Sequence, residues 1–230
     1  MAIPDSVRTL EQDLRVTFGP RLQSLVIYRP ATDAPDAPIP TLAIVDDLTP
    51  DDLRACAARV DGWQEAGLAT PLLVAASEFR RSLDAFPLEF GAILADHTAV
   101  TGRDPFVDMK VEAADLRRAC EVQARSHLLH LREGYIESRG RGDAVAELIV
   151  DSAAPLAGLL KSVARLLGTP SRNGMEAAAL VERAARLPTD SLGAILKVRQ
   201  LAGDEARRLL PAYLHAVEGL TRFVDNWSAS

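Results

Sequence analysis

The chain is poor in the residues that most often carry chemistry: its 230 residues include two cysteines, four histidines and 5% aromatics. Cys56 and Cys120 form no Cys-x-x-Cys pair, which excludes a disulfide framework and a zinc site of the usual spacing. No apolar run approaches the ~18 residues that cross a bilayer, so we expect no contact with a membrane. Residues 1–6 lack the basic start and apolar core of a signal peptide, and we therefore expect a cytoplasmic protein.

Basic residues are scarce in the first half of the chain. Residues 1–106 contain 9 Lys and Arg against 16 Asp and Glu, whereas residues 107–230 contain 17 against 16. An acidic surface repels the phosphate backbone of nucleic acids at long range. We therefore expect no general nucleic-acid binding. Hydrophobic residues make up 48% of the chain, enough for the cores of one large or two small domains.

Strand and helix patterns alternate in the first half. Three short aliphatic runs are typical of buried strands, at residues 22–29, 41–45 and 72–75. Thr49-Pro50-Asp51-Asp52 is a strong helix start, because threonine caps, proline fits the first turn and acids favour the positive end of the helix dipole. The other expected elements are a helix over 7–18, a continuation of the Thr49 helix to Gly67, a short helix at 77–83 and an apolar element at 86–94. This order predicts a small α/β domain over residues 1–108.

The second half is helical, and residues 109–230 are predicted to form an all-α bundle. One apolar stripe runs along 113–138, and further helical segments lie near 143–168, 175–187, 190–202 and 204–227. The last segment has apolar residues at alternating spacings of three and four, a bundle seam that we interpret as a surface for self-association into a homodimer. The predicted fold class of the whole chain is α+β.

Four stretches together carry a family resemblance. They are LQSLVIY (22–28), TLAIVDD (41–47), LDAFPLEF (83–90) and LREGY (131–135) on the long helix. In order and spacing they resemble bacterial nucleotidyltransferase-like proteins, in which a helical domain follows a small mixed-sheet α/β domain. The resemblance implies a Gly-Ser pair after the first strand, which binds nucleotide phosphates. It also implies an Asp-x-Asp pair at the second strand, which holds a divalent metal ion.

The residues at those positions depart from the family pattern. The Gly-Ser pair falls on Arg29-Pro30, and the two aspartates fall on Ile39 and Thr41. Proline has no N–H to donate, and neither isoleucine nor threonine holds magnesium as a carboxylate does. Asp33 and Asp36 precede the strand but lie among prolines. We interpret the chain as a catalytically degenerate relative with no catalytic residues and no cofactor, which binds a nucleotide-like ligand or an unidentified protein.

Charged residues nearby are the candidates for ligand binding. The alternative to a degenerate relative is an active nucleotidyltransferase that moves a nucleoside monophosphate from an NTP, with magnesium held by Asp46, Asp47 and Glu89. Arg125 and Arg132 belong to a row of arginines that recurs every seven residues along the long helix. This row is either a phosphate-binding or acid-binding surface or, as we favour, a solvated flank with ordinary ion pairs.

A second alternative comes from two matches to the loose Arg-x(4–6)-His pattern of HEPN-type ribonucleases. The matches are Arg125 to His130 and Arg208 to His215. Arginine is so frequent in this chain that chance matches are expected. Arg125 and His130 also lie about 140° apart around one helix, so they would converge only with a second chain.

Overall fold

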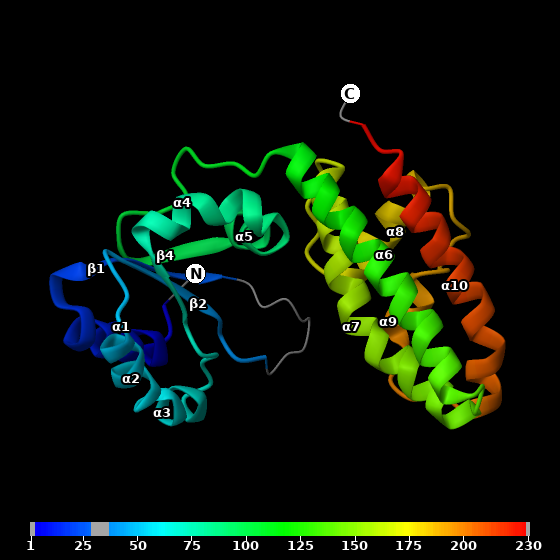
Figure 1. The fold of residues 1–230 in the computed structure, drawn as a ribbon, viewed down its shortest axis with the longest axis horizontal. Helices are drawn as coiled ribbons and strands as arrows, with labels where there is room; N and C mark the ends of the chain where they lie inside the picture. The colour runs from blue at the N-terminus through cyan, green and yellow to red at the C-terminus, as the bar shows by residue number, and fades with distance from the viewer. Residues whose placement is uncertain (1–2, 29–36, 229–230) are drawn as a thin grey trace. The chain divides into compact units, whose positions relative to one another are not determined.

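The chain forms two compact units, Met1–Val111 and Glu112–Ser230, in a computed structural model that describes residues 3–28 and 37–228. Unit 1 combines a β-sheet with helices, and unit 2 is helical (Figure 1). The predicted α+β class is therefore confirmed. None of the described helices is long and apolar enough to span a bilayer.

Unit 1 is built on a four-stranded sheet with the strand order β3-β2-β1-β4. β1 (Leu22–Tyr28) runs antiparallel to both β2 (Thr41–Val45) and β4 (His97–Gly102), and β2 is parallel to β3 (Leu72–Ala75). β1, β2 and β3 confirm the three predicted strands. β4 is an addition to the prediction, and it lies at an edge of the sheet with no side chain fully buried.

Helices cover both faces of this sheet because strand side chains alternate between its faces. One face is covered by α1 (Asp5–Phe18), the 3₁₀ turn η1 (Gly19–Arg21), α2 (Pro50–Ala57) and α3 (Val60–Glu65); the other is covered by α4 (Ala76–Ala85) and α5 (Pro87–Ala95) (Figure 1). The first face buries Leu25, Ile27, Ala43 and Val45, and the second buries Val26, Leu42 and Ile44. α2 begins as predicted, with Thr49 and Asp52 forming a reciprocal capping box.

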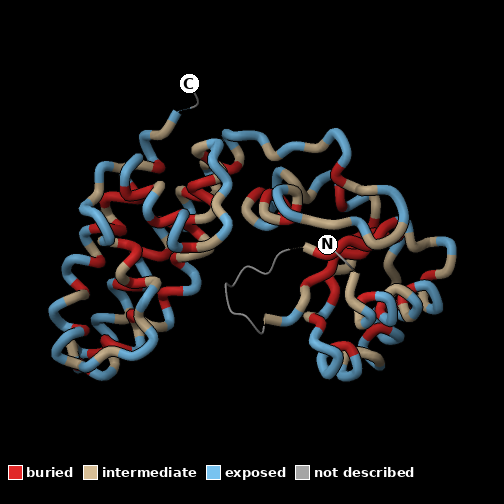
Figure 2. Tube along the Cα trace, turned by 180° about the vertical axis from the view of Figure 1, so that it is seen from behind, coloured by how far each residue is buried: buried red, intermediate tan, exposed pale blue. Residues whose placement is uncertain are grey.

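Unit 2 is a bundle of α6 (Ala113–Ser138), α7 (Gly142–Leu166), α8 (Gly174–Ala184), α9 (Gly193–Lys197) and α10 (Gly203–Asp225). α7 packs against each of the other four helices, and buried residues line the sides that face one another (Figure 2). α9 is shorter than the predicted 190–202. The seam that we expected to mediate self-association is buried within this unit, including Leu210, Tyr213 and Val217. That seam is therefore not a surface that a second copy could meet.

A chain of hydrogen bonds crosses the core of unit 2. The imidazole Nε2 of His127 lies 2.7 Å from the Tyr213 hydroxyl, which lies 3.0 Å from Ser152 Oγ. Ser152 donates its proton to the Ile149 carbonyl oxygen at 2.7 Å. Because that carbonyl can only accept, the remaining protons are satisfied if His127 Nε2–H donates to Tyr213 and Tyr213 donates to Ser152. Burial lowers the pKa of His127 to about 4, and positive charge on His130 adds to the effect.

Glu182 is a buried carboxylate on α8, with only 5% of its surface exposed. Its oxygens accept backbone N–H bonds from Asp190 at 2.8 Å, Leu192 at 2.7 Å and Gly193 at 2.9 Å. Asp190 has a φ of 63°, in the left-handed region that non-glycine residues seldom adopt. One side chain therefore holds the loop between α8 and α9 in its observed conformation.

The N-termini of α7 and α10 touch backbone to backbone. A Cβ added at Gly203 would lie 2.9 Å from the carbonyl carbon of Gly142, whereas a Cβ at Gly158 would meet nothing within 4 Å. We expect Gly203→Ala to lower the free energy of unfolding by about 1–3 kcal/mol, because backbone atoms cannot move aside as a flexible side chain can. Gly158→Ala is the matched control and is expected to stabilise α7 by up to about 1 kcal/mol. Urea unfolding followed by circular dichroism measures both, and equal effects would contradict the packing argument.

Candidate functional site

The second strand of the sheet shows where the resemblance would place a metal ion. The resemblance assigns the positions of the two aspartates to Ile39 and Thr41, at the end of β2 where Thr41 pairs with Ile27. Ile39 packs against the apolar cluster that α1, α2 and α3 form with the sheet. Thr41 is 0% exposed, and its Oγ1 is buried with no hydrogen-bond partner among the described residues. These two positions present apolar surface and one neutral oxygen to the interior of unit 1.

Asp46 and Asp47 lie at the opposite end of β2. They follow Val45, which pairs with Leu22 at the start of β1, whereas Thr41 pairs with Ile27 near the end of β1. At ~3.3 Å per residue, the strand places Asp46 about 16 Å along β2 from Thr41. Neither carboxylate can therefore replace the ligands that Ile39 and Thr41 do not supply.

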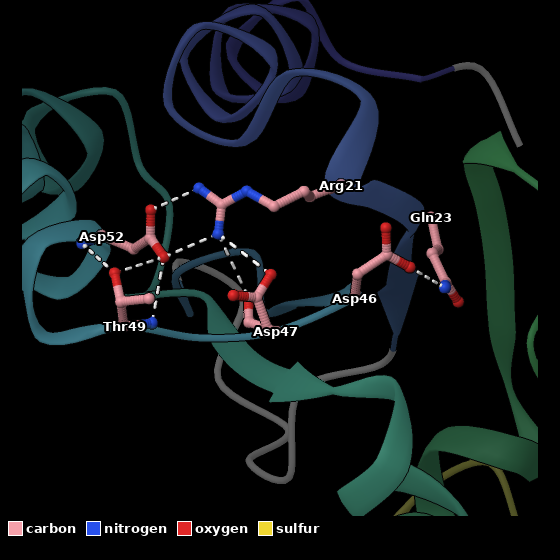
Figure 3. A network of polar contacts seen from close by, with 6 residues as sticks. All are labelled: Arg21, Gln23, Asp46, Asp47, Thr49 and Asp52. Atoms are coloured by element: carbon pink, nitrogen blue, oxygen red, sulfur yellow. Dashed lines mark hydrogen bonds and ion pairs between the residues drawn. The ribbon is translucent and has the colours of Figure 1, made fainter.

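Asp47 belongs to a polar network that fixes α2 to the start of β1 (Figure 3). The Arg21 guanidinium donates to Asp52 at 2.7 and 2.9 Å and to Asp47 at 3.2 Å. Asp52 in turn accepts from the Thr49 N–H at 2.9 Å and from the Thr49 hydroxyl at 2.7 Å. Asp46 accepts a hydrogen bond from the Gln23 side chain.

The electrostatics of this network are those of a structural ion pair. The hydrogen bonds from Arg21 and then Thr49 hold the pKa of Asp52 well below its usual range. The bonds to Asp52 and Asp47 raise the pKa of Arg21 in turn. Asp46, Asp47 and Asp52 each already accept a hydrogen bond from a residue of unit 1. The network therefore stabilises the N-terminus of α2.

Glu89 lies in the first turn of α5 and is exposed. It acts on Tyr28: burial raises the pKa of that phenol, and the negative charge of Glu89 raises it further. Tyr28 pairs with His97 at the end of β1 away from Leu22, ~20 Å along the strand from the end where Asp46 lies. The structure thus places Glu89 and the Asp46–Asp47 pair at opposite ends of β1, too far apart to share a metal ion.

The two candidate arginines belong to unit 2 and are both paired there. Arg125 contacts Glu121 at 3.1 Å and Asp225 at 3.0 Å, and Arg132 contacts Glu218 at 2.7 Å. The hydrogen bonds that Arg125 donates to Asp225 and then to Glu121 raise the pKa of Arg125. Asp225 and Glu218 come from α10, so these two arginines meet acids of a neighbouring helix. This arrangement agrees with the ion-paired flank that we favoured from the sequence.

Within residues 3–28 and 37–228, no group of three or more His, Cys, Asp or Glu side chains gathers where it could hold a metal ion. Arg29-Pro30, Asp33 and Asp36 lie outside the described residues. Glu182 and the Ser152 hydroxyl beside Tyr213 are among the buried polar groups that the sequence did not single out, because these residues show only helical periodicity.

The architecture of the chain is that of the nucleotidyltransferase-like fold, with a mixed-sheet α/β part followed by a mostly helical region. No protein-family model and no curated protein matches the sequence. Among solved structures, the spectinomycin adenyltransferase AAD(9) from Enterococcus faecialis, crystallised with ATP and spectinomycin, matches with a TM-score of 0.59. The match covers 96% of this chain and 99% of that chain at 10% sequence identity, and it shows a shared fold.

Proposed function

We propose that this chain is a non-catalytic protein of the nucleotidyltransferase fold, which serves to bind a nucleotide-like ligand or a protein partner. The observation that carries the proposal is the side-chain environment at the two metal-ligand positions. Ile39 lies in the apolar cluster of unit 1, and Thr41 offers a single buried hydroxyl. Magnesium requires near-octahedral oxygen coordination and is bound through one or two carboxylates, which these positions lack.

The fold alone supports binding of a nucleotide. The structural neighbour was crystallised with ATP and spectinomycin, so these two compounds are suitable probes for this chain. A residual nucleotide site without carboxylate-held magnesium has no means to neutralise the charge that develops on a departing pyrophosphate. We expect nucleotide binding to be independent of magnesium, because Ile39 and Thr41 supply no carboxylate that would hold the ion.

The proposal is tested by pyrophosphate release from ATP with magnesium, with and without spectinomycin. We expect release at the rate of a protein-free control, and the same rate for a triple variant with Asp46→Asn, Asp47→Asn and Glu89→Gln. Calorimetry with ATP is expected to show the same affinity with magnesium and with a chelator. Magnesium-dependent release that the triple variant abolishes would establish the active enzyme and overturn the proposal.

A further inference from the structure

His97, the first residue of β4, contacts the segment that leads from β4 to α6. This segment, residues 103–112, is called the connector below, because it joins the two compact units. The His97 side chain is 14% exposed, and its Nε2 lies 3.1 Å from Asp104 Oδ1. The His97 ring also lies against the ring of Phe106, with 4.7 Å between the two centroids. His97 therefore holds the first half of the connector on unit 1 through two of its side chains.

Both ring nitrogens of His97 face hydrogen-bond acceptors. Nδ1 lies 3.0 Å from the Ile93 carbonyl oxygen and 3.2 Å from that of Leu94, both at the end of α5. Nε2 faces the Asp104 carboxylate. Carbonyl and carboxylate oxygens only accept, so a hydrogen bond at each ring nitrogen requires an N–H at each. The imidazolium has two N–H groups, whereas the neutral ring has one and directs a lone pair at the other acceptor.

The connector supplies the charge that contacts this ring. The hydrogen bonds that Asp104 accepts from the Phe106 N–H, at 2.9 Å, and then from His97 hold the pKa of Asp104 below its usual range. Asp104 is therefore ionised at neutral pH, and an imidazolium forms a charge-assisted hydrogen bond with it. The other charged residues of the connector are exposed, and solvent screens them: Arg103, Asp108, Lys110 and Glu112.

The elements around the ring contribute negative charge or apolar surface. α5 contributes Glu89, whose charge acts on Tyr28, the strand partner of His97 on β1. Tyr28 is neutral at physiological pH, because burial raises the pKa of its phenol. Asp96 precedes His97 and is exposed, and α4 faces the connector with the ring of Phe79. The charges on these elements therefore favour the protonated ring.

We propose that His97 is a pH-sensitive switch that holds the connector on unit 1 through two hydrogen bonds when its ring is protonated and through one when its ring is neutral. An ordinary histidine changes charge near pH 6.5. Below this pH both N–H groups are present, and the connector is held most firmly. Above it, the carbonyls of α5 and the carboxylate of Asp104 compete for the one remaining N–H. The connector leads directly into α6, so the switch sets how firmly the chain ahead of unit 2 is held.

Hydrogen exchange at about pH 5.5 and about pH 8 tests the switch, with protection factors corrected for the intrinsic effect of pH on exchange. The amides of Phe106 and Met109 report on the connector, because they donate to the Asp104 carboxylate and to the Phe106 carbonyl. We expect their protection to be about 3–10-fold higher at the lower pH, a modest factor because the Asp104 side chain is 40% exposed. The amide of Leu25 in β1 is the reference within unit 1. Equal protection at the two pH values, relative to Leu25, would overturn the proposal.

Asp104→Asn removes the carboxylate and is expected to abolish this difference. The asparagine oxygen can still accept the Phe106 N–H, and its amide can donate to the neutral ring. Asp108→Asn is the matched control and should keep the wild-type difference. It removes an exposed carboxylate of the same connector, and asparagine tolerates the φ of 62° at this position. Circular dichroism verifies that both variants fold.

The ¹⁵N chemical shifts of the His97 ring provide a second measurement on the wild-type chain. They are expected to show two N–H groups at about pH 5.5 and one at about pH 8. A ring that keeps one charge state across this range would refute the switch. The same conclusion would follow if Asp104→Asn retained the pH dependence of protection or if Asp108→Asn removed it.

Discussion

Replacing Glu182 with glutamine is expected to lower the free energy of unfolding of unit 2 by about 3 kcal/mol. The carboxylate of Glu182 accepts three backbone N–H bonds, two from the loop that leads into α9 and one from Gly193 at the start of α9. Glutamine has nearly the same shape, but its amide nitrogen donates and would face an N–H that also donates. At least one buried N–H then has no hydrogen-bond acceptor. The remaining hydrogen bonds are weaker because their acceptor is no longer charged.

The matched control for this change is Glu176→Gln on the same helix. Glu176 accepts one backbone N–H bond, from Arg172, in an exposed position, so we expect it to cost less than about 1 kcal/mol. Hydrogen exchange adds a local measurement, because the amide protons of Asp190, Leu192 and Gly193 should exchange faster only in Glu182→Gln. Equal losses of unfolding free energy in the two variants would contradict the prediction, because the loop would then keep its conformation without the hydrogen bonds to Glu182.

Unit 2 is expected to lose about 3 kcal/mol of stability as the pH falls from 6.5 to about 4, through His127 alone. The ordinary histidine pKa is 6.5, and burial lowers the pKa of His127 to about 4. Between these values the unfolded chain binds a proton that the folded chain does not, so acid favours unfolding. Above pH 6.5 both states are neutral and the contribution is fully present. Below about pH 4 both are protonated and the loss is complete.

The residues around His127 explain why acid has this effect. α7 presents the neutral hydroxyl of Ser152, α10 presents that of Tyr213, and the nearest charge that affects the pKa is His130 on α6 itself. His127→Gln keeps an N–H for Tyr213 and removes the titration. The stability difference between wild type and this variant should therefore shrink by about 3 kcal/mol from pH 7.5 to pH 4. His130→Gln, at an exposed position, should leave most of the pH dependence of stability in place. Parallel curves of unfolding free energy against pH for wild type and His127→Gln would refute the assignment of this dependence to His127.

Strands and long helices were predictable because their signals are local. The runs at 22–29, 41–45 and 72–75 are short and apolar, and Thr49 and Asp52 cap α2 through bonds within one helical turn. β4 was not predicted because its sequence, HTAVTG, has few large apolar residues. The position of β4 in the sheet is set by its pairing with β1. α9 was overestimated because periodicity alone does not locate the end of a short helix.

The candidate site was less predictable because its contacts join distant parts of the chain. The position of Asp46 and Asp47 at the end of β2 away from Thr41 follows from the sequence, but their contacts with Arg21 and Gln23 depend on the pairing of β2 with β1. The seven-residue row of arginines was visible from spacing. Its partners on α10 were not, since Arg132 and Glu218 are 86 residues apart. Local patterns identify a helix face, and only the fold identifies what that face meets.

The hydrogen bond between His127 and Tyr213 also joins residues that are 86 positions apart. During translation α6 and α7 leave the ribosome well before α10. Until α10 emerges, the imidazole of His127 lies on an otherwise apolar surface and lacks the hydrogen bond to Tyr213. α10 therefore completes the core of unit 2. A premature stop codon ahead of α10 would be expected to yield an unfolded, protease-sensitive product instead of a shortened version of the same domain.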